Sequence, residues 1–189
     1  MNIYARINNS ILFNLIALTK PRVNFLIIFT AIVGMLLAQD FNLNYSLMVY
    51  ASIGIYLAAS AAAVINHIVD QKIDAIMDRT KGRPLIKGNV TSSHAIYFSV
   101  FISSISTYIL FEYVNTITTI LTLFSIIVYS IIYSVYLKNL TSQNIVIGGI
   151  AGAMPPLLGW TAITNGVSEL PLLLFLIIFL WTPPHFWAL

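Results

Sequence analysis

The sequence predicts an all-α fold in which a bundle of helices crosses a membrane several times. Of the 189 residues, 59% are hydrophobic and only 8% are charged, whereas soluble domains carry about 25% charged residues. Apolar stretches close to the roughly 20 residues that span a bilayer recur along the whole chain. No polar block is long enough to fold by itself. We therefore expect one polytopic transmembrane helical bundle over residues 1–189, with the lipid bilayer as a partner and no nucleic acid.

Six apolar runs predict the membrane helices, with boundaries accurate to about 2–4 residues. They lie near residues 22–39, 46–65, 94–111, 114–136, 145–163 and 170–187. The connections between them are short except for residues 66–93, which hold more than half of the charged residues of the chain. We expect this loop to carry the chemistry.

The charge pattern predicts the orientation of the helices. All nine Lys and Arg residues fall on one side of a six-span arrangement, whereas the connections on the other side hold Asp40, Glu112 and Glu169. Because Lys and Arg are retained on the cytoplasmic side during insertion, the N-terminus and the 66–93 loop should be cytoplasmic.

The absence of cysteine excludes thiolate metal sites. With no organelle presequence pattern, a bacterial inner membrane is the simplest location.

Four polar residues recur at every fourth position where the loop begins, namely Asn66, Asp70, Asp74 and Asp78. If the second helix continues through them, they form one polar stripe along its side. Carboxylates one turn apart can each give an oxygen to Mg²⁺, which fills its other positions with water and phosphate oxygens. The stripe therefore predicts a Mg²⁺ site on Asp70, Asp74 and Asp78 that binds a diphosphate.

Arginines follow the aspartates, and Gly82 and Pro84 end the helix. Arg79 and Arg83 could pair with phosphate oxygens and stabilise a departing diphosphate. The alternative interpretation is a solvated loop whose arginines only set the topology. It does not account for three aspartates in register at a membrane edge, where charge is costly and usually functional. His67 lies about 100° off the stripe, and we interpret it as a packing residue.

Several runs of sequence are shared with one family. The Asn-x3-Asp-x3-Asp spacing is joined by TKPR at 19–22, RTKGRPL at 79–85, GGIAGAMPPLLGW at 148–160 and WTPPHFWAL at 181–189. In these runs the sequence resembles the UbiA superfamily of intramembrane prenyltransferases over nearly its whole length. The run at 181–189 is similar to the branch of the superfamily that farnesylates haem.

The resemblance implies a reaction and the residues that carry it out. A farnesyl group passes from farnesyl diphosphate to the 2-vinyl group of haem B, and water completes the substituent of haem O. The matching positions imply that Asp70, Asp74, Arg79 and Arg83 are catalytic, that Mg²⁺ is the cofactor, and that Asn66 binds substrate. No protein partner is indicated.

Four further residues are candidates for binding substrate. Lys20, Arg22 and Lys138 lie on the same side as the acidic loop, and the resemblance suggests contacts to the diphosphate or the haem propionates. Interfacial anchors that reach lipid headgroups explain these cations about equally well. His185 could ligate or stack on haem, although a histidine in a Pro- and Trp-rich belt is more often structural.

Three tyrosines mark one face of the fourth predicted helix. Tyr129, Tyr133 and Tyr136 recur at i, i+4 and i+7, which places them on the same side of an α-helix. They line the prenyl cavity, where aromatic faces stabilise a cation, or they form a packing stripe.

The chain also departs from the family pattern. Members have nine helices and a second acidic motif after the sixth, so this chain corresponds to about six of the nine helices and is expected to be C-terminally incomplete. An aromatic or quinone-precursor prenyltransferase is one alternative, and such relatives often have aspartate at the position of His67. An inactive truncated remnant is a second. A membrane cation transporter is a third; it should show paired interrupted helices in corresponding halves, and the sequence has no internal repeat.

Overall fold

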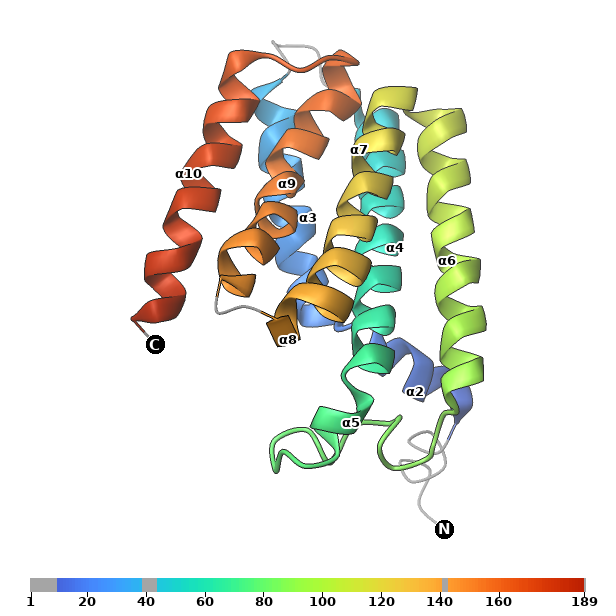
Figure 1. Ribbon diagram of the computed structural model, residues 1–189. Helices are drawn as coiled ribbons and strands as arrows, with labels where there is room; N and C mark the ends of the chain where they lie inside the picture. Colours follow the sequence, from blue (N-terminus) through green and yellow to red (C-terminus); the bar gives the residue numbers. More distant parts are fainter. Residues whose placement is uncertain (1–9, 39–43, 141–142, 189) are drawn as a thin grey trace.

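The computed structural model describes residues 10–38, 44–140 and 143–188, and every element in these ranges is a helix (Figure 1). The prediction of an all-α fold is confirmed. The elements are α2 (Ile11–Leu18), α3 (Pro21–Leu37), α4 (Tyr45–Val69), α5 (Gln71–Asp74), α6 (Ser92–Tyr113), α7 (Thr116–Ile127), η1 (Val128–Leu137), α8 (Lys138–Leu140), α9 (Asn144–Thr164) and α10 (Glu169–Trp187).

The long helices have the length and apolarity of membrane spans. Five satisfy both criteria singly, and α2 with α3 forms a sixth candidate that is bent by 48°. The six predicted ranges overlap α3, α4, α6, α7 with η1, α9 and α10. The chain is thus an integral, multi-pass membrane protein.

The sequence analysis missed α2, which precedes the first predicted span. Its signal is Ser10 before an apolar run, a typical helix start: the Ser10 hydroxyl accepts a hydrogen bond from the Phe13 amide at 3.2 Å. The bend follows at Lys20, and α3 begins at Pro21, which suits a first helical position because proline has no amide hydrogen to leave unpaired.

Glycines let α3 and α9 pack backbone to backbone. A Cβ atom on Gly159 would lie 1.9 Å from the carbonyl oxygen of Ala31, and one on Gly34 would lie 2.1 Å from that of Pro156. Small residues are the usual means of close helix approach in lipid, where the hydrophobic effect does not drive helices together. These two contacts fix α9 against α3 in the middle of the bundle.

Two apolar clusters organise the molecule. The larger joins α3, α4, α6 and α9, and its buried members are Ala31, Met35, Ala51, Ile55, Leu110, Met154, Leu157, Leu158 and Ala162. The smaller lies at the end of the bundle that carries the 66–93 loop and comprises Leu18, Val64, Leu85, Val90 and Ala95. Because Leu85 and Val90 belong to the loop itself, the smaller cluster anchors the loop beneath α4.

The fourth predicted span changes its helical form halfway along. It begins as α-helix α7 and continues from Val128 to Leu137 as a π-helix, η1. A π-helix has i→i+5 hydrogen bonds and a wider turn, and it is rare except as a local feature that often marks functional sites. The predicted α-helical periodicity is therefore wrong for this half of the span.

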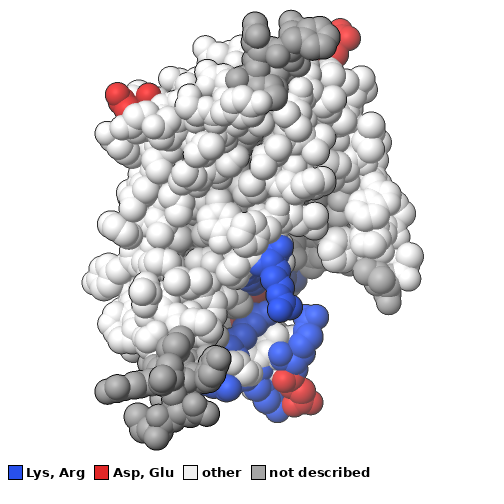
Figure 2. All heavy atoms as spheres, turned by 180° about the vertical axis from the view of Figure 1, so that it is seen from behind, with Lys and Arg blue, Asp and Glu red and all other residues white. Residues whose placement is uncertain are grey.

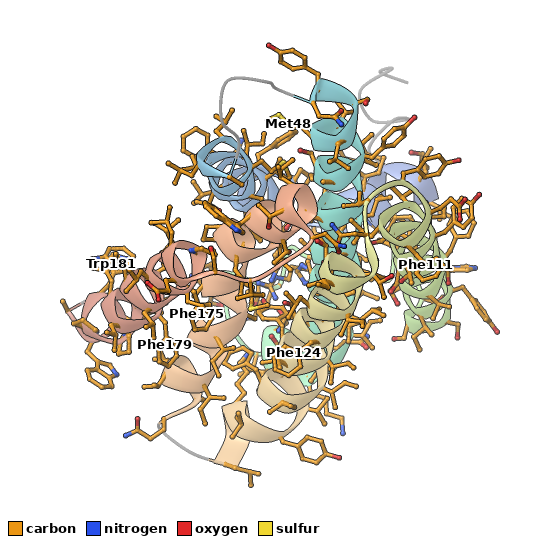
Figure 3. The ribbon with its side chains drawn as sticks, turned by 90° about the horizontal axis from the view of Figure 1, so that it is seen from above. Met48, Phe111, Phe124, Phe175, Phe179 and Trp181 are labelled. Atoms are coloured by element: carbon orange, nitrogen blue, oxygen red, sulfur yellow. The ribbon has the colours of Figure 1, made fainter. Side chains whose placement is uncertain are left out.

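The last helix, α10, lies at the side of the bundle and packs against α9. Phe175 and Phe179 stack with their ring centroids 5.9 Å apart, and both lie on the side of α10 that faces α9, whereas Trp181 is on the outer side (Figure 3). Trp181 is 58% exposed. Most of the surface of α10 is available to lipid.

The Lys and Arg side chains of the described residues lie at one end of the molecule. Figure 2 shows them gathered at the end that carries the 66–93 loop, with acidic side chains among them and others at the opposite end. Glu112 lies in the last turn of α6 and Glu169 begins α10 at that opposite end. Arg6 and Asp40, which also entered the orientation prediction, lie outside the described residues.

Candidate functional site

Three polar residues are buried where α4 ends. Asn66, Asp70 and Asp74 are 5%, 5% and 4% exposed. Asp70 caps the C-terminus of α4, and its carbonyl oxygen accepts a hydrogen bond from the Asp74 amide at 2.8 Å. The two carboxylates are therefore one helical turn apart, as the spacing predicts.

Each of these buried groups has a cationic partner from another part of the chain. Lys138 Nζ donates to Asp70 Oδ2 at 2.6 Å, and Arg83 Nη1 donates to Asp74 Oδ2. Lys20 Nζ donates to Asn66 Oδ1 at 3.0 Å. The structure thus brings six predicted site residues together, including Lys138, which is 68 positions from Asp70 in the sequence. We call these six residues, Lys20, Asn66, Asp70, Asp74, Arg83 and Lys138, the polar cluster.

The π-helix supplies a contact that the sequence analysis missed. Asn66 Nδ2 donates to Ser134 Oγ at 3.1 Å, and Ser134 Oγ donates to the carbonyl oxygen of Tyr129 at 2.8 Å. Ser134 is fully buried. This chain of bonds orients the Asn66 amide so that its oxygen faces Lys20. A serine in an apolar helix is too common a feature to have revealed this role.

The predicted stripe ends before Asp78. In a continuing α-helix the carbonyl oxygen of Asp74 would accept the Asp78 amide hydrogen, but the Thr80 hydroxyl donates to that oxygen instead, at 2.8 Å. Side-chain hydroxyls compete with the helix in this way. The chain turns, and the Asp78 side chain is 96% exposed and bonded to Lys81 at 2.7 Å. In this structure Asp78 therefore lies apart from Asp70 and Asp74, and its role as a third metal ligand stays a prediction.

The same turn separates the two predicted arginines. Arg83 folds back to Asp74 because the loop after it is held by Leu85 in the smaller apolar cluster. Arg79 is exposed and makes no ion pair with a described residue. Of the two, the structure brings Arg83 alone to the carboxylates.

Two other predicted binding residues lie apart from the polar cluster. Arg22 is exposed and has no polar contact with a described residue. His185 is exposed on α10, where its ring stacks on Trp181 with centroids 4.2 Å apart. His67, interpreted as a packing residue, is 5% exposed, and its Nδ1 atom has no hydrogen-bond partner in the described structure.

An apolar cavity of about 440 Å³ adjoins the polar cluster. Small residues from α4 and α9 form much of its wall, including Ala59, Ala63, Gly149 and Gly152. Lys20 lines the cavity and also contacts Asn66, so the ammonium joins the cavity to the polar cluster.

Tyrosines of η1 form part of the cavity wall. Tyr129 and Tyr133 line it and stack with ring centroids 5.7 Å apart. Tyr136 is 58% exposed and lies away from it. In a π-helix each residue advances by a smaller angle than in an α-helix, so a spacing of seven no longer returns to the same face. The prediction that all three share one face is wrong for Tyr136.

The donor set of the polar cluster suits Mg²⁺ together with a phosphate ligand. No group of three His, Asp or Glu side chains comes together as a metal site within the described ranges. Mg²⁺ does not need one, because it is usually held by one or two carboxylates plus substrate phosphates and water. Asp70 and Asp74 provide two carboxylates, and the side chains of Lys20, Arg83 and Lys138 converge on the same polar cluster.

The membrane helix bundle holds buried carboxylates, three convergent cations and an adjoining apolar cavity. These features define a class of protein whose site suits an amphiphile with an anionic head and an apolar tail. The chain belongs to the UbiA prenyltransferase family, whose model matches residues 27–189.

Curated relatives agree with this family. The chain is 54% identical to a protoheme IX farnesyltransferase of Hahella chejuensis over 172 residues, which are 91% of this chain and 58% of that protein. It is 52% identical over 172 residues to protoheme IX farnesyltransferase 2 of Pseudoalteromonas atlantica, covering 56% of that protein. The chain thus spans somewhat over half the length of these relatives.

A solved structure shares the fold. It comes from work titled "Structural and mechanistic insights into the biosynthesis of Digeranylgeranylglyceryl phosphate synthase in membranes", with a TM-score of 0.79 and 20% identity. The match covers 90% of this chain and 59% of that one. At this identity the likeness shows the fold alone.

Proposed function

We propose that the chain provides the diphosphate site of a prenyltransferase that converts haem B to haem O, with farnesyl diphosphate as the prenyl donor. The observation that carries the proposal is the polar cluster at one end of an apolar cavity. Diphosphate and farnesyl have opposite solvation needs, and the two parts of the site match them. The relatives' name, protoheme IX farnesyltransferase, supports haem as the acceptor.

The cations of the polar cluster bind the diphosphate. Lys20, Arg83 and Lys138 carry three positive charges against the two negative charges of Asp70 and Asp74, which leaves one net positive charge beside the cavity. Phosphate oxygens can replace the carboxylates as partners of Arg83 and Lys138, because guanidinium and ammonium groups bind both kinds of anion. The carboxylates are then free for a metal ion.

Asp70 and Asp74 are the residues that would hold Mg²⁺. The ion, when bound, neutralises charge on the diphosphate and so makes it a better leaving group. Arg83 and Lys138 stabilise the same negative charge as it grows on the departing oxygen.

Prenyl transfer breaks the bond between the farnesyl C1 atom and the diphosphate oxygen, and the electron pair leaves with the diphosphate. The vinyl π electrons of haem B form the new carbon–carbon bond, and water adds to the resulting cation and loses a proton to solvent. The Tyr129 and Tyr133 rings line the cavity, where aromatic faces stabilise an allylic cation. The alanine and glycine walls exclude water that would capture it too early.

We also propose the location and orientation of the chain. It lies in a bacterial inner membrane with its N-terminus and the 66–93 loop in the cytoplasm. The support is the gathering of Lys and Arg at one end of the molecule in Figure 2, because Lys and Arg near short loops remain cytoplasmic. In this orientation the polar cluster faces the cytoplasm.

The test is an incubation of membranes that contain the chain with haem B, farnesyl diphosphate and Mg²⁺, followed by chromatography for haem O. The Hahella chejuensis relative serves as the positive control. Haem O above the level of empty membranes supports the proposal. Transfer to an aromatic acid or quinone precursor instead, with no haem O, would replace it with the alternative within the family.

A further inference from the structure

Lys20 adopts a backbone conformation that is unfavourable for a residue with a side chain. Its φ and ψ are 53° and 59°, in the left-handed region, where Cβ lies too close to the following carbonyl oxygen. In the described part of the chain, the other non-glycine residue with positive φ is Asn165, a residue type that tolerates this region better. Strain of this kind persists where neighbouring contacts enforce it, and it concentrates at functional sites.

One buried side chain supplies those contacts. Asn24, in the first turns of α3, is 2% exposed. Its Nδ2 atom donates to the carbonyl oxygen of Thr19 at 2.8 Å and to Ser60 Oγ of α4 at 2.9 Å. The first bond spans the bend, because Thr19 and Asn24 lie on either side of Lys20. The second ties the bend to α4.

The same helix receives the Lys20 side chain. Lys20 Nζ donates to Asn66, which lies six positions after Ser60 in α4. The bend is therefore held against α4 at two points, by the Asn24 amide and by the Lys20 ammonium. A right-handed conformation at Lys20 would turn α3 relative to α2 and carry the ammonium away from Asn66.

We propose that Asn24, with Ser60 as its acceptor, is a positioning residue that holds the bend between α2 and α3 and thereby keeps the Lys20 ammonium beside the diphosphate. This inference rests on the proposed function, since it assigns Lys20 to the diphosphate. Asn24 itself acts through Lys20, because its amide hydrogens are taken up by Thr19 and Ser60.

The experiment measures the affinity of the purified chain in nanodiscs for two probes, farnesyl thiodiphosphate, which resists cleavage, and inorganic diphosphate. Asn24→Leu keeps the side-chain volume and removes the donor. We expect it to weaken binding of both probes by about tenfold, because the displaced Lys20 ammonium no longer makes its hydrogen bond to the charged diphosphate of the probe. Lys20→Gln should cause a loss of similar size.

A double-mutant cycle separates positioning from general stability. If Asn24 acts through Lys20, Asn24→Leu has little further effect in the Lys20→Gln background. Equal losses in both backgrounds, or unchanged binding by Asn24→Leu, would overturn the inference. Ser60→Ala provides a second variant in which the Thr19 bond remains. It should give a smaller loss that again disappears in the Lys20→Gln background, and additivity there counts against the inference.

Asn115 offers a matched control at the other end of the bundle. Its Nδ2 atom also joins two helices, by donating to the carbonyl oxygens of Thr161 and Ala162. Asn115→Leu should lower stability and leave the affinity for both probes unchanged, and a tenfold loss there would contradict a specific role for Asn24. If the unmodified chain binds neither probe, or if the Lys20→Gln variant binds both probes as tightly as the unmodified chain, the proposed function also fails.

Discussion

Asp70 and Asp74 differ from Asp78 in their surroundings, although all three follow the same spacing. The first two are buried and paired with Lys138 and Arg83, whereas the Asp78 side chain is 96% exposed. Buried charges at a membrane edge are costly and usually serve a function, and an exposed ion pair contributes about 0–1 kcal/mol. The same residue type therefore has two roles within eight positions.

This difference gives a prediction for the carboxylates. Asp70→Asn and Asp74→Asn keep the side-chain size but remove the charge, and we expect each to lower Mg²⁺-dependent prenyl transfer by about 10²-fold or more. Asp78→Asn, the matched control, should stay within about twofold of the unmodified chain. The measurement is the initial rate of prenyl transfer for each variant across a Mg²⁺ titration, normalised to the amount of protein in the membrane. Near-normal Mg²⁺-dependent rates for Asp70→Asn would remove it from the metal site.

The sequence could predict part of the polar cluster. Spacing alone indicated Asn66, Asp70 and Asp74, because they follow one another along one helix. The partners Lys138 and Ser134 come from a segment 68 positions away, and only the packing of η1 against α4 shows which atoms meet. Asp78 departs from the predicted stripe because the Thr80 hydroxyl takes the Asp74 carbonyl oxygen, and a helical spacing cannot reveal that contact.

At the scale of elements, hydropathy predicted the spans well because lipid requires long apolar helices. It missed α2, which at eight residues is too short to span a membrane. It also could not distinguish π-helix from α-helix in η1, since both are equally apolar. The local hydrogen-bond pattern depends on neighbours such as Asn66 that the segment meets only in the folded bundle.

The contact between α3 and α9 leads to a second prediction. Gly159→Val would place Cβ against the Ala31 carbonyl, so we expect a loss of about 3 kcal/mol or more in stability. Gly152 is the control, because a Cβ atom there meets nothing within 4 Å. Gly152→Ala should leave stability unchanged or raise it by up to about 1 kcal/mol. Thermal unfolding in detergent, followed by size-exclusion chromatography, compares them. Equal stability of Gly159→Val and the unmodified chain would contradict the close packing.

At the scale of the whole molecule, the bundle is polar at both ends and positive at one of them (Figure 2). The cations at this end fall into two groups that the sequence alone did not distinguish. Lys20, Arg83 and Lys138 turn inward to the polar cluster. Lys72, Arg79, Lys81 and Lys87 remain exposed and are available to set the orientation of the helices.

Orientation is directly testable because the chain has no cysteine. Lys81→Cys and Glu112→Cys each introduce a single thiol at opposite ends of the bundle. We expect a membrane-impermeant maleimide added to intact spheroplasts to label Glu112→Cys and to label Lys81→Cys only after the membrane is opened. The reverse pattern would place the polar cluster on the outer side and overturn the proposed orientation.

The π-helix also bears on how this sequence can change over evolution. Ser134 lies within the π-helix, and Lys138 directly follows it. Removal of one residue between Val128 and Tyr133 would therefore rotate both away from Asn66 and Asp70 at once. Point substitutions on the outer face of η1 do not change the direction in which these two side chains point. The segment should therefore accept exchange of its lipid-facing residues while keeping a constant length, and single-residue insertions or deletions there should be selected against more strongly than in any exposed loop.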